Sequence, residues 1–350
     1  MREAIFHFAT DGAPVDCREL SGGHINRSYL VGTDAGARYV LQRVNTAVFP
    51  DVRAVMGNAA RIGEWMARRP DALPAAVRYL PATDGAPWYE DAAGNCWRCY
   101  RYVENSVCLP QPETLSDLEQ GGVAFGRFLH ALRDFPAEEL EETIPRFHDT
   151  PDRYRRLREA AERDRCGRVR AAGPELRRAF ALKAAACRLH ALRESGALPL
   201  RVTHNDAKFG NVLLDRDTRR ALCVIDLDTV MPGLAAYDFG DGIRSGASVG
   251  GADEPLGLDL ERFEAFTRGF LAGCPTLTGA ELRSLPLGAL AITAELGVRF
   301  LTDWLDGDRY FRADDTEQNL RRARRHLLLA EELERRQEEL DAAVLRLAGR

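Results

Sequence analysis

The sequence contains little lysine and no apolar run that approaches the roughly 20 residues needed to span a membrane. Only Lys183 and Lys208 are lysines among the 48 basic residues, and the net charge of −5 gives no chain-wide positive field. Nucleic acid and membranes are therefore not expected as partners. The arginine-rich stretch "DRYRRLREAAERDRCGRVR" is interpreted as a solvated helix face rather than a nucleic-acid patch.

We also expect no secretory leader and no disulfide framework. The opening "MREAIFHFATDGAPVD" has no sustained apolar stretch followed by small residues, so we expect a soluble, cytoplasmic protein. The eight cysteines are scattered through 350 residues with 45% apolar content, and a chain of this size does not need disulfides. Cys96 and Cys99 form one CxxC, but no second pair or nearby histidine completes a zinc site. We expect buried thiols.

The residue pattern changes from β-rich to α-rich along the chain. Residues 21–45 carry two alternating apolar runs around a glycine-containing turn, which predicts an antiparallel hairpin. After "CLPQPET" the apolar spacing becomes helical, interrupted by the short β-rich pieces "NVLLD" and "ALCVID". The predicted fold class is α+β, with lobes at residues 1–107 and 108–350. Helices are expected near residues 52–69, 115–135, 151–172, 174–195, 258–273, 279–305 and 314–347.

The stretch "RVTHNDAKFGNVLLD" places His204, Asp206, Lys208 and Asn211 at fixed steps before an apolar strand, and "LCVIDLDT" then adds Asp226. Phosphoryl transfer needs a group that orients the acceptor hydroxyl, oxygen ligands for Mg²⁺ and cations near the phosphates. These residues supply those types in order. The alternative is a turn in which short polar side chains only cap backbone groups. We favour phosphoryl transfer, and we expect the histidine to pack beneath the loop.

On these motifs the chain resembles the aminoglycoside phosphotransferase and choline kinase superfamily, over nearly its whole length. "HNDAKFGN" has the order of the catalytic loop in that family, and "VID" ends the strand that carries the metal-binding aspartate. The resemblance implies a protein-kinase-like fold with a small antiparallel-sheet N-terminal lobe and a mainly helical C-terminal lobe. It implies ATP and Mg²⁺ as cofactors, Asp206 as catalytic base, Lys208 near the γ-phosphate, and Asn211 and Asp226 on the metal.

The front of the chain resembles the nucleotide-binding side of these kinases. "SGGHINRSYLV" resembles their nucleotide loop, which implies phosphate contacts from Gly22, Gly23 and Asn26. "YVLQRV" offers Arg43 as the cation for the phosphates, with Glu64 as its candidate partner or else simply solvated. "YRYVENS" resembles the strand-to-hinge connection, whose backbone at Tyr102 to Glu104 is expected to bind adenine.

The acceptor class rests on a finer resemblance to N-acetylhexosamine 1-kinases, which form sugar 1-phosphates. It is carried by "GGHINRSYLV", "YVLQRVN", "IDLDTVMPGLAAYDFGDGIR" and "ELGVRFLTDWLDGDRYF". A sugar acceptor is implied, with its anomeric hydroxyl as the reacting group. Sugar contacts are expected from His24, Asp228, Thr229, Arg299 and Asp303.

Two features of this acceptor region remain open from sequence. Glu295, Arg299 and Asp303 recur at four-residue steps on one helix face, and they either line the cleft or form a solvated salt-bridge ladder. The aromatic residues that follow form either a stacking wall for the sugar or part of the core; they are Trp304, Tyr310 and Phe311. Asp238 in "YDFGD" matches an aspartate that braces the catalytic loop in relatives.

Other functions remain as alternatives. A kinase of another small alcohol (an aminoglycoside, choline, homoserine or methylthioribose) shares the phosphate-handling residues. A cationic acceptor is left open by Asp303, Trp304, Asp306 and Asp308. A protein kinase is disfavoured because "DLDTVMPG" is not DFG and no APE motif follows. A non-catalytic nucleotide-binding scaffold is disfavoured because Asp206, Asn211 and Asp226 are all present. The charged C-terminal segment leaves the oligomeric state open.

Overall fold

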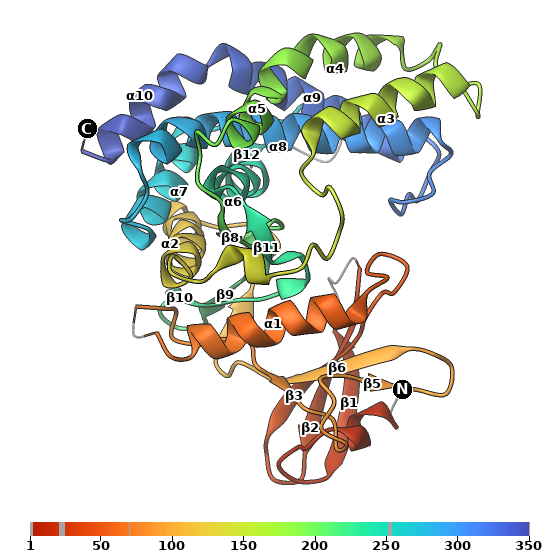
Figure 1. Ribbon diagram of the computed structural model, residues 1–350, viewed down its shortest axis with the longest axis vertical. Coiled ribbons are helices and arrows are strands. Elements are labelled where there is room, and N and C mark those ends of the chain that lie inside the picture. Colours follow the sequence, from red (N-terminus) through yellow and green to blue (C-terminus); the bar gives the residue numbers. More distant parts are fainter. Residues whose placement is uncertain (1–2, 21–24, 70, 251–253, 350) are drawn as a thin grey trace.

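The structure is a computed structural model of the chain and describes residues 3–20, 25–69, 71–250 and 254–349. It has two lobes, with a strand-rich lobe below and a helical lobe above in Figure 1. The N-terminal sheet is antiparallel, in the order β1-β2-β3-β6-β4, with β5 also paired to β6. Its strands are β1 (Pro14–Leu20), β2 (Arg27–Thr33), β3 (Arg38–Arg43), β4 (Tyr79–Leu80), β5 (Tyr89–Glu90) and β6 (Cys96–Arg101).

The predicted hairpin is confirmed by the pairing of β2 with β3, which aligns Tyr29 with Leu41. Helix α1 (Val52–Met66) follows where a helix is predicted, and the Asp51 side chain caps it by accepting from the Ala54 N–H at 3.0 Å. α1 lies between the sheet and the helical lobe (Figure 1). Its buried Ile62 joins the core of the helical lobe, so this helix ties the two lobes together.

Short strands carry the central loops of the molecule. β7 (Ser106–Cys108) pairs with β9 (Val212–Asp215), which pairs with β10 (Ala221–Val224), while β8 (Arg201–Thr203) pairs with β11 (Met231–Gly233). The lobe boundary predicted after residue 107 therefore lies within β7, a strand that belongs to the same sheet as the "NVLLD" segment. A further hairpin joins β12 (Ser248–Val249) to β13 (Gly257–Leu258).

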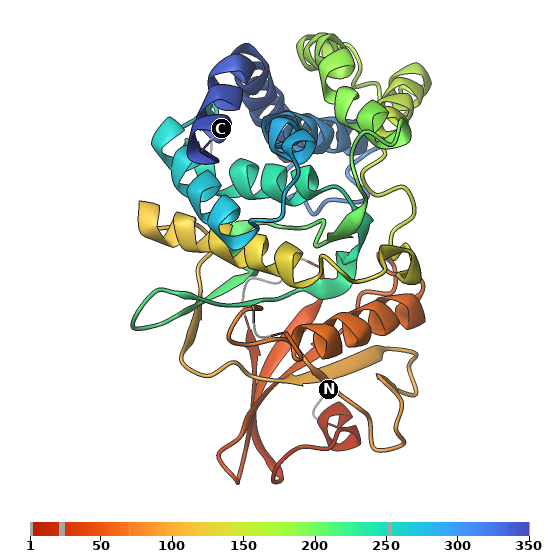
Figure 2. The ribbon, with the colours of Figure 1, turned by 60° about the vertical axis from the view of Figure 1, so that its left-hand side comes forward.

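The helices of the C-terminal lobe lie above these strands, which run along the side that faces α1 (Figures 1 and 2). Its helices are α2 (Leu115–Ala131), α3 (Thr150–Arg163), α4 (Gly173–Ala186), α5 (Arg188–Glu194), α6 (Ala235–Gly242), α7 (Leu260–Gly273), α8 (Gly279–Leu305), α9 (Gln318–Arg335) and α10 (Gln337–Leu347). The helix expected at 174–195 is divided at Cys187 and the one at 314–347 is divided at Arg336. α6 has no counterpart in the sequence prediction.

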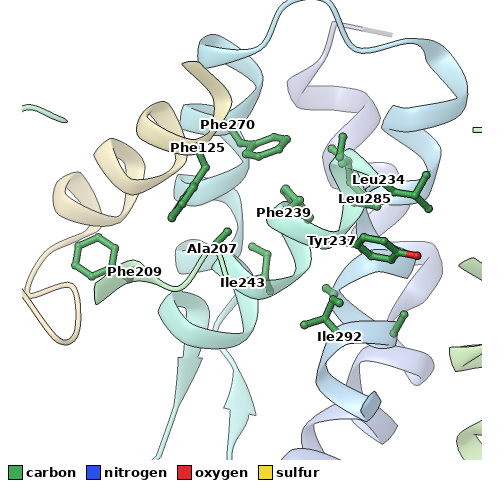
Figure 3. Close-up of a cluster of buried hydrophobic side chains, with 14 of the residues drawn as sticks. Phe125, Ala207, Phe209, Leu234, Tyr237, Phe239, Ile243, Phe270, Leu285 and Ile292 are labelled. Atoms are coloured by element: carbon green, nitrogen blue, oxygen red, sulfur yellow. The ribbon is translucent and has the colours of Figure 1, made fainter. Parts of the chain in front are cut away.

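Helix α8 qualifies the expectation that no apolar run is long enough to span a membrane. It is long and apolar enough by length and composition, and 83% of its apolar window is buried inside the protein. Figure 3 shows Leu285 and Ile292 of this helix in the buried cluster beside α6. The apolar character of α8 is accounted for by its position in the core.

Candidate active site

The catalytic-loop motif lies between β8 and β9, and its apolar residues anchor it. Ala207 and Phe209 are buried and point into the cluster drawn in Figure 3, near Phe125 of α2. Because these two residues alternate with Asp206 and Lys208, their anchoring leaves the two polar side chains directed away from the core. The apolar residues of the motif therefore fix the loop in place, and its charged residues face the site.

The polar residues of the motif converge as the sequence predicts. The Lys208 ammonium donates to Asp206 Oδ2 at 2.6 Å, and the Asn211 amide donates to the same oxygen at 3.0 Å and to the Asp206 carbonyl at 2.8 Å. Asp226 reaches the cluster from the end of β10, with its Oδ2 4.0 Å from Lys208 Nζ. Asp226 has a φ of 67°, so a left-handed turn brings its side chain here.

Buried contacts hold this loop from behind. Asp238 of α6 accepts from the backbone N–H groups of His204 and Asn205, each at 2.8 Å. His204 is fully buried, with Nε2 2.9 Å from the Ile225 carbonyl and its ring edge-on to Phe125. Asp238 therefore braces the loop, and the histidine packs beneath it as expected.

The pKa values of the two central carboxylates, Asp206 and Asp226, are shifted in opposite directions. Burial disfavours the charged form of Asp206, but the Lys208 ammonium and the Asn211 amide outweigh it and lower its pKa to about 2. Burial, followed by the neighbouring Asp228 carboxylate, raises the pKa of Asp226 to about 7. Asp206 is thus a firmly ionised, weak base, whereas Asp226 lacks sufficient positive charge around it.

The donor set fits a magnesium ion bound together with a nucleotide. A divalent cation would supply the positive charge that Asp226 lacks, and Asn211 would add an amide oxygen, a ligand type that Mg²⁺ accepts. Within the described residues, no group of three or more His, Cys, Asp or Glu side chains forms a site on its own. This agrees with an ion held by few protein ligands plus phosphate oxygens and water.

An arginine that the sequence analysis overlooked completes the site. Arg98 of β6 is fully buried, donates from Nη1 to Asp228, and donates from Nε to the Gln42 amide oxygen at 2.9 Å. Asn26 donates to the other Asp228 oxygen at 2.6 Å. An arginine between buried strand neighbours in "NCWRCY" is the signal that was missed, because such a cation needs a buried acid.

Two residues predicted to contact the acceptor are engaged inside the protein instead. Both oxygens of Asp228 are used by Arg98 and Asn26, and its side chain is only 2% exposed. The Thr229 hydroxyl donates to the His204 carbonyl at 2.7 Å and is also buried. These side chains join the nucleotide side of the molecule to the catalytic loop, and direct sugar contacts from them are not supported.

The orientation of Arg43 differs from the expectation. Successive strand residues point to opposite faces, and Gln42 shares the face of Arg98. Arg43 is paired with Trp97, on the face away from Asp228. Glu64 lies 3.7 Å from Arg68 on the surface, and no ion pair with Arg43 occurs among the described residues.

The remaining nucleotide-side predictions have mixed outcomes. Asn26 faces the site but is used by Asp228 and by the Asn45 N–H, which donates to its Oδ1 at 2.9 Å. Glu104 pairs with Arg38, whose guanidinium also lies 4.6 Å from the Tyr102 ring centre. Adenine contacts at this hinge stay a prediction. Three predicted residues, Gly22, Gly23 and His24, lie outside the described residues.

A cavity of about 520 Å³ opens between α3, the C-terminal end of α8 and the segment that follows α8. Arg299 and Asp303 line it, whereas Glu295 is buried against His148 and Thr150, each at 3.1 Å. These three residues are all described, and no ion pair links them to one another, so the salt-bridge ladder does not form. Asp303 instead accepts three backbone N–H groups of residues 309–311, at 2.8 to 2.9 Å.

Aromatic residues form part of the same cavity. Tyr310 and Phe311 line it, as does Phe147, and the Arg299 guanidinium lies 5.3 to 5.8 Å from the centres of these three rings. Trp304 is instead buried in the core, where its indole N–H donates to the Thr316 carbonyl at 2.6 Å. Of the three aromatic candidates, Tyr310 and Phe311 therefore line the cavity and Trp304 belongs to the core, and stacking on a sugar stays a prediction.

The segment at residues 143–148 joins this cavity to the catalytic loop. Ile144, Pro145 and Phe147 line the cavity. At the ends of the segment, the Thr143 hydroxyl donates to the Asp228 carbonyl at 2.7 Å, and His148 Nε2 lies 3.1 Å from the Asn205 carbonyl. The same segment therefore contacts both the cavity and the catalytic loop.

Comparison with known proteins agrees with this architecture. Residues 16–274 match the phosphotransferase enzyme family. The fold is shared with an aminoglycoside phosphotransferase from Alicyclobacillus acidocaldarius, at 15% identity and a TM-score of 0.64 over 99% of this chain and 96% of that one. A microcompartment-associated aminopropanol kinase is 17% identical, with a TM-score of 0.60 over 99% and 98% of the two chains. Choline kinase from Cryptosporidium parvum is 14% identical, with a TM-score of 0.58 over 95% of this chain and 92% of that one. The predicted kinase-like fold is confirmed.

Proposed function

This chain belongs to the phosphotransferase enzyme family, and we propose that it transfers the γ-phosphate of ATP to the anomeric hydroxyl of an N-acetylhexosamine. The observation that carries phosphoryl transfer is the convergence of Asp206, Lys208 and Asp226 at the end of two strands. The choice of acceptor is supported by the four segments that resemble N-acetylhexosamine 1-kinases. The segment at residues 143–148 lines the cavity and contacts the catalytic loop, which makes the cavity the candidate acceptor site.

In the proposed reaction the anomeric oxygen bonds to the γ-phosphorus, the bond from that phosphorus to ADP breaks, and the hydroxyl proton passes to Asp206. A carboxylate with a pKa of about 2 is too weak a base to ionise a sugar hydroxyl beforehand. In a loose transition state the proton leaves late, so orientation and charge carry most of the acceleration. The anomeric hydroxyl is the most acidic one of the sugar, which suits such a base.

The cationic side of the site has a separate role. The Lys208 ammonium, 2.6 Å from Asp206, is placed to offset charge on the transferring phosphate and to hold the carboxylate in one orientation. Asn211 and Asp226 would hold Mg²⁺, which when bound offsets charge on the phosphate oxygens.

The cavity favours a neutral or anionic acceptor over a cationic one. An aminoglycoside or choline needs an acidic or aromatic cage around its positive charge. The three candidate acids are occupied: Asp303 by backbone N–H groups, Asp306 by Arg163 at 3.4 Å, and Asp308 by Arg168 at 2.7 Å. Five arginines and three carboxylates line the cavity, so a cation would meet net repulsion.

The test is an ADP-release assay with Mg-ATP and a panel of free sugars, amino alcohols and aminoglycosides. N-acetylglucosamine or N-acetylgalactosamine is expected to give the largest stimulation, with a sugar 1-phosphate as the product identified by NMR. Asp206→Asn is expected to lower turnover about 10²- to 10⁴-fold while ATP still binds, because it removes the proton acceptor. Stimulation by amino alcohols alone, or full turnover by the Asn variant, would refute the proposal.

A further inference from the structure

The charge in the acceptor cavity is not balanced by the protein itself. Arg155 reaches Glu159 at 2.5 Å, and Arg163 lies 3.4 Å from Asp306, so these lining arginines have acid partners. Arg156 donates to Asp152 at 2.7 Å. Two lining arginines, Arg153 and Arg299, remain without a carboxylate within ion-pair distance in the part of the chain that the structure describes.

These two arginines have unused hydrogen-bond donors. Arg153 donates from Nη2 to the Phe147 carbonyl at 2.7 Å, but its Nε is buried and has no hydrogen-bond partner among the described residues. The Arg299 guanidinium carbon lies 5.3 to 5.8 Å from the centres of three aromatic rings, and its N–H groups make no hydrogen bond among the described residues, so they are available to an acceptor. Buried arginine donors are costly unless an acceptor reaches them.

The two cations also act on each other. Burial, followed by repulsion from Arg299, lowers the pKa of Arg153. Glu295, which acts electrostatically on both, already accepts hydrogen bonds from His148 and Thr150. A ligand with a negative group would relieve this repulsion and supply the missing acceptor oxygens. Arginine is well suited to such a group because its fork matches the two oxygens of a carboxylate or a phosphate.

We infer that the cavity recognises an anionic substituent on the acceptor, a carboxylate or a phosphate, through Arg299 with Arg153 beside it. This inference rests on the proposed function for the identity of the reacting hydroxyl, but the anion site itself does not depend on turnover. The aromatic residues pack against the apolar body of the acceptor, while the arginines bind its charged group at the end remote from Asp206. The preferred acceptor is then an acidic derivative of the sugar.

The first test compares matched acceptors. N-acetylglucosamine is assayed beside the same sugar carrying a carboxylate through an ether on O3, or a phosphate on O6, all with a free anomeric hydroxyl. At least one anionic sugar is expected to have a kcat/KM tenfold or more above that of the neutral sugar. Arg299→Gln is expected to reduce this ratio to about one. Arg312→Gln removes the same charge from an arginine that is 94% exposed just beyond the cavity, and it should keep the ratio.

The second test measures binding without turnover. Calorimetric titration of the full chain with inorganic phosphate and with lactate, in saturating ADP to occupy the nucleotide site, is expected to show binding that Arg299→Gln loses and Arg312→Gln retains. Equal binding by all three proteins, or none by any, overturns the anion site. If no sugar is phosphorylated but the Arg299-dependent binding is seen, the proposed sugar kinase activity fails and the anion site stands. If a sugar is phosphorylated without any anionic preference, the kinase activity stands and the anion site fails.

Discussion

The catalytic loop and the cavity lined by Arg299 both contact the segment at residues 143–148, yet their charges are arranged in opposite ways. Around the loop the protein supplies its own partners: Lys208 for Asp206, and Arg98 for Asp228. In the cavity, Arg299 has three aromatic rings and, among the described residues, no acid in ion-pair contact. The comparison indicates that the reacting groups are arranged before any ligand arrives, whereas the recognition groups are completed by the ligand.

The largest expected effect separates the two regions by stability. Arg98→Met leaves Asp228 buried without its cation, so the free energy of unfolding should fall by about 3–5 kcal/mol. Arg299→Met removes only contacts with aromatic rings, so the loss should be about 1 kcal/mol or less. Urea unfolding of both variants provides the measurement. Equal losses would mean that the two arginines contribute to the fold in the same way.

A second variant tests whether the loss of stability comes from the unpaired Asp228 carboxylate or from any substitution at this position of β6. Adding Asp228→Leu to Arg98→Met removes the unpaired carboxylate, and part of the lost stability should return. No recovery would mean that packing of the arginine, rather than its charge, is what the fold requires.

A smaller effect concerns pH in the ligand-free protein. Asp226 has a folded-state pKa of about 7, above its ordinary value of 3.8, so the folded state binds more protons between these pH values. Its contribution to stability therefore falls as pH rises from about 4 to 7 and stays low above. Asp226→Asn should be more stable than the wild type at pH 8, by on the order of 1 kcal/mol, and the gain should vanish near pH 4. Thermal unfolding across this range tests the sign, and Arg299→Gln should show no comparable change with pH.

The smallest effect tests the two faces of the nucleotide-side sheet. Arg43 lies on the face away from Asp228, so Arg43→Gln should change kcat/KM by less than about threefold and stability by less than about 0.5 kcal/mol. Kinetics at varied ATP concentration provide the measurement. A loss of a hundredfold or more in that variant would restore the sequence-based assignment of Arg43 to the phosphates.

Much of the fold was predictable because local signals agree with it. The helix expected at 279–305 has the bounds of α8, since Thr278 and Glu281 form a capping box at its start. α6 was missed because "AAYDFGDG" is short, contains two glycines and is buried at every residue, so no exposed polar face marks it as a helix. Its stability comes from the surrounding core, which local sequence does not encode.

The site also contains contacts that local sequence predicts and contacts that it does not. The convergence of Asp206, Lys208 and Asp226 was predictable because a strand, a loop and a strand bring them together within a short span of sequence. The pair of Arg98 and Asp228 was not, because 130 residues separate its members and nothing local in the sequence links them. The cavity around Arg299 was found only in part, since the backbone contacts that occupy Asp303 depend on how the following segment folds back.

The buried pair of Arg98 and Asp228 also restricts how the molecule can move. One member belongs to the N-terminal sheet and the other follows β10, so pulling the lobes apart would break this buried ion pair. α1 adds an apolar seam across the same junction. Opening of the two lobes about a hinge should therefore be rare. Substrates are expected to bind, and products to leave, through rearrangements of peripheral segments while the centre of the molecule stays fixed.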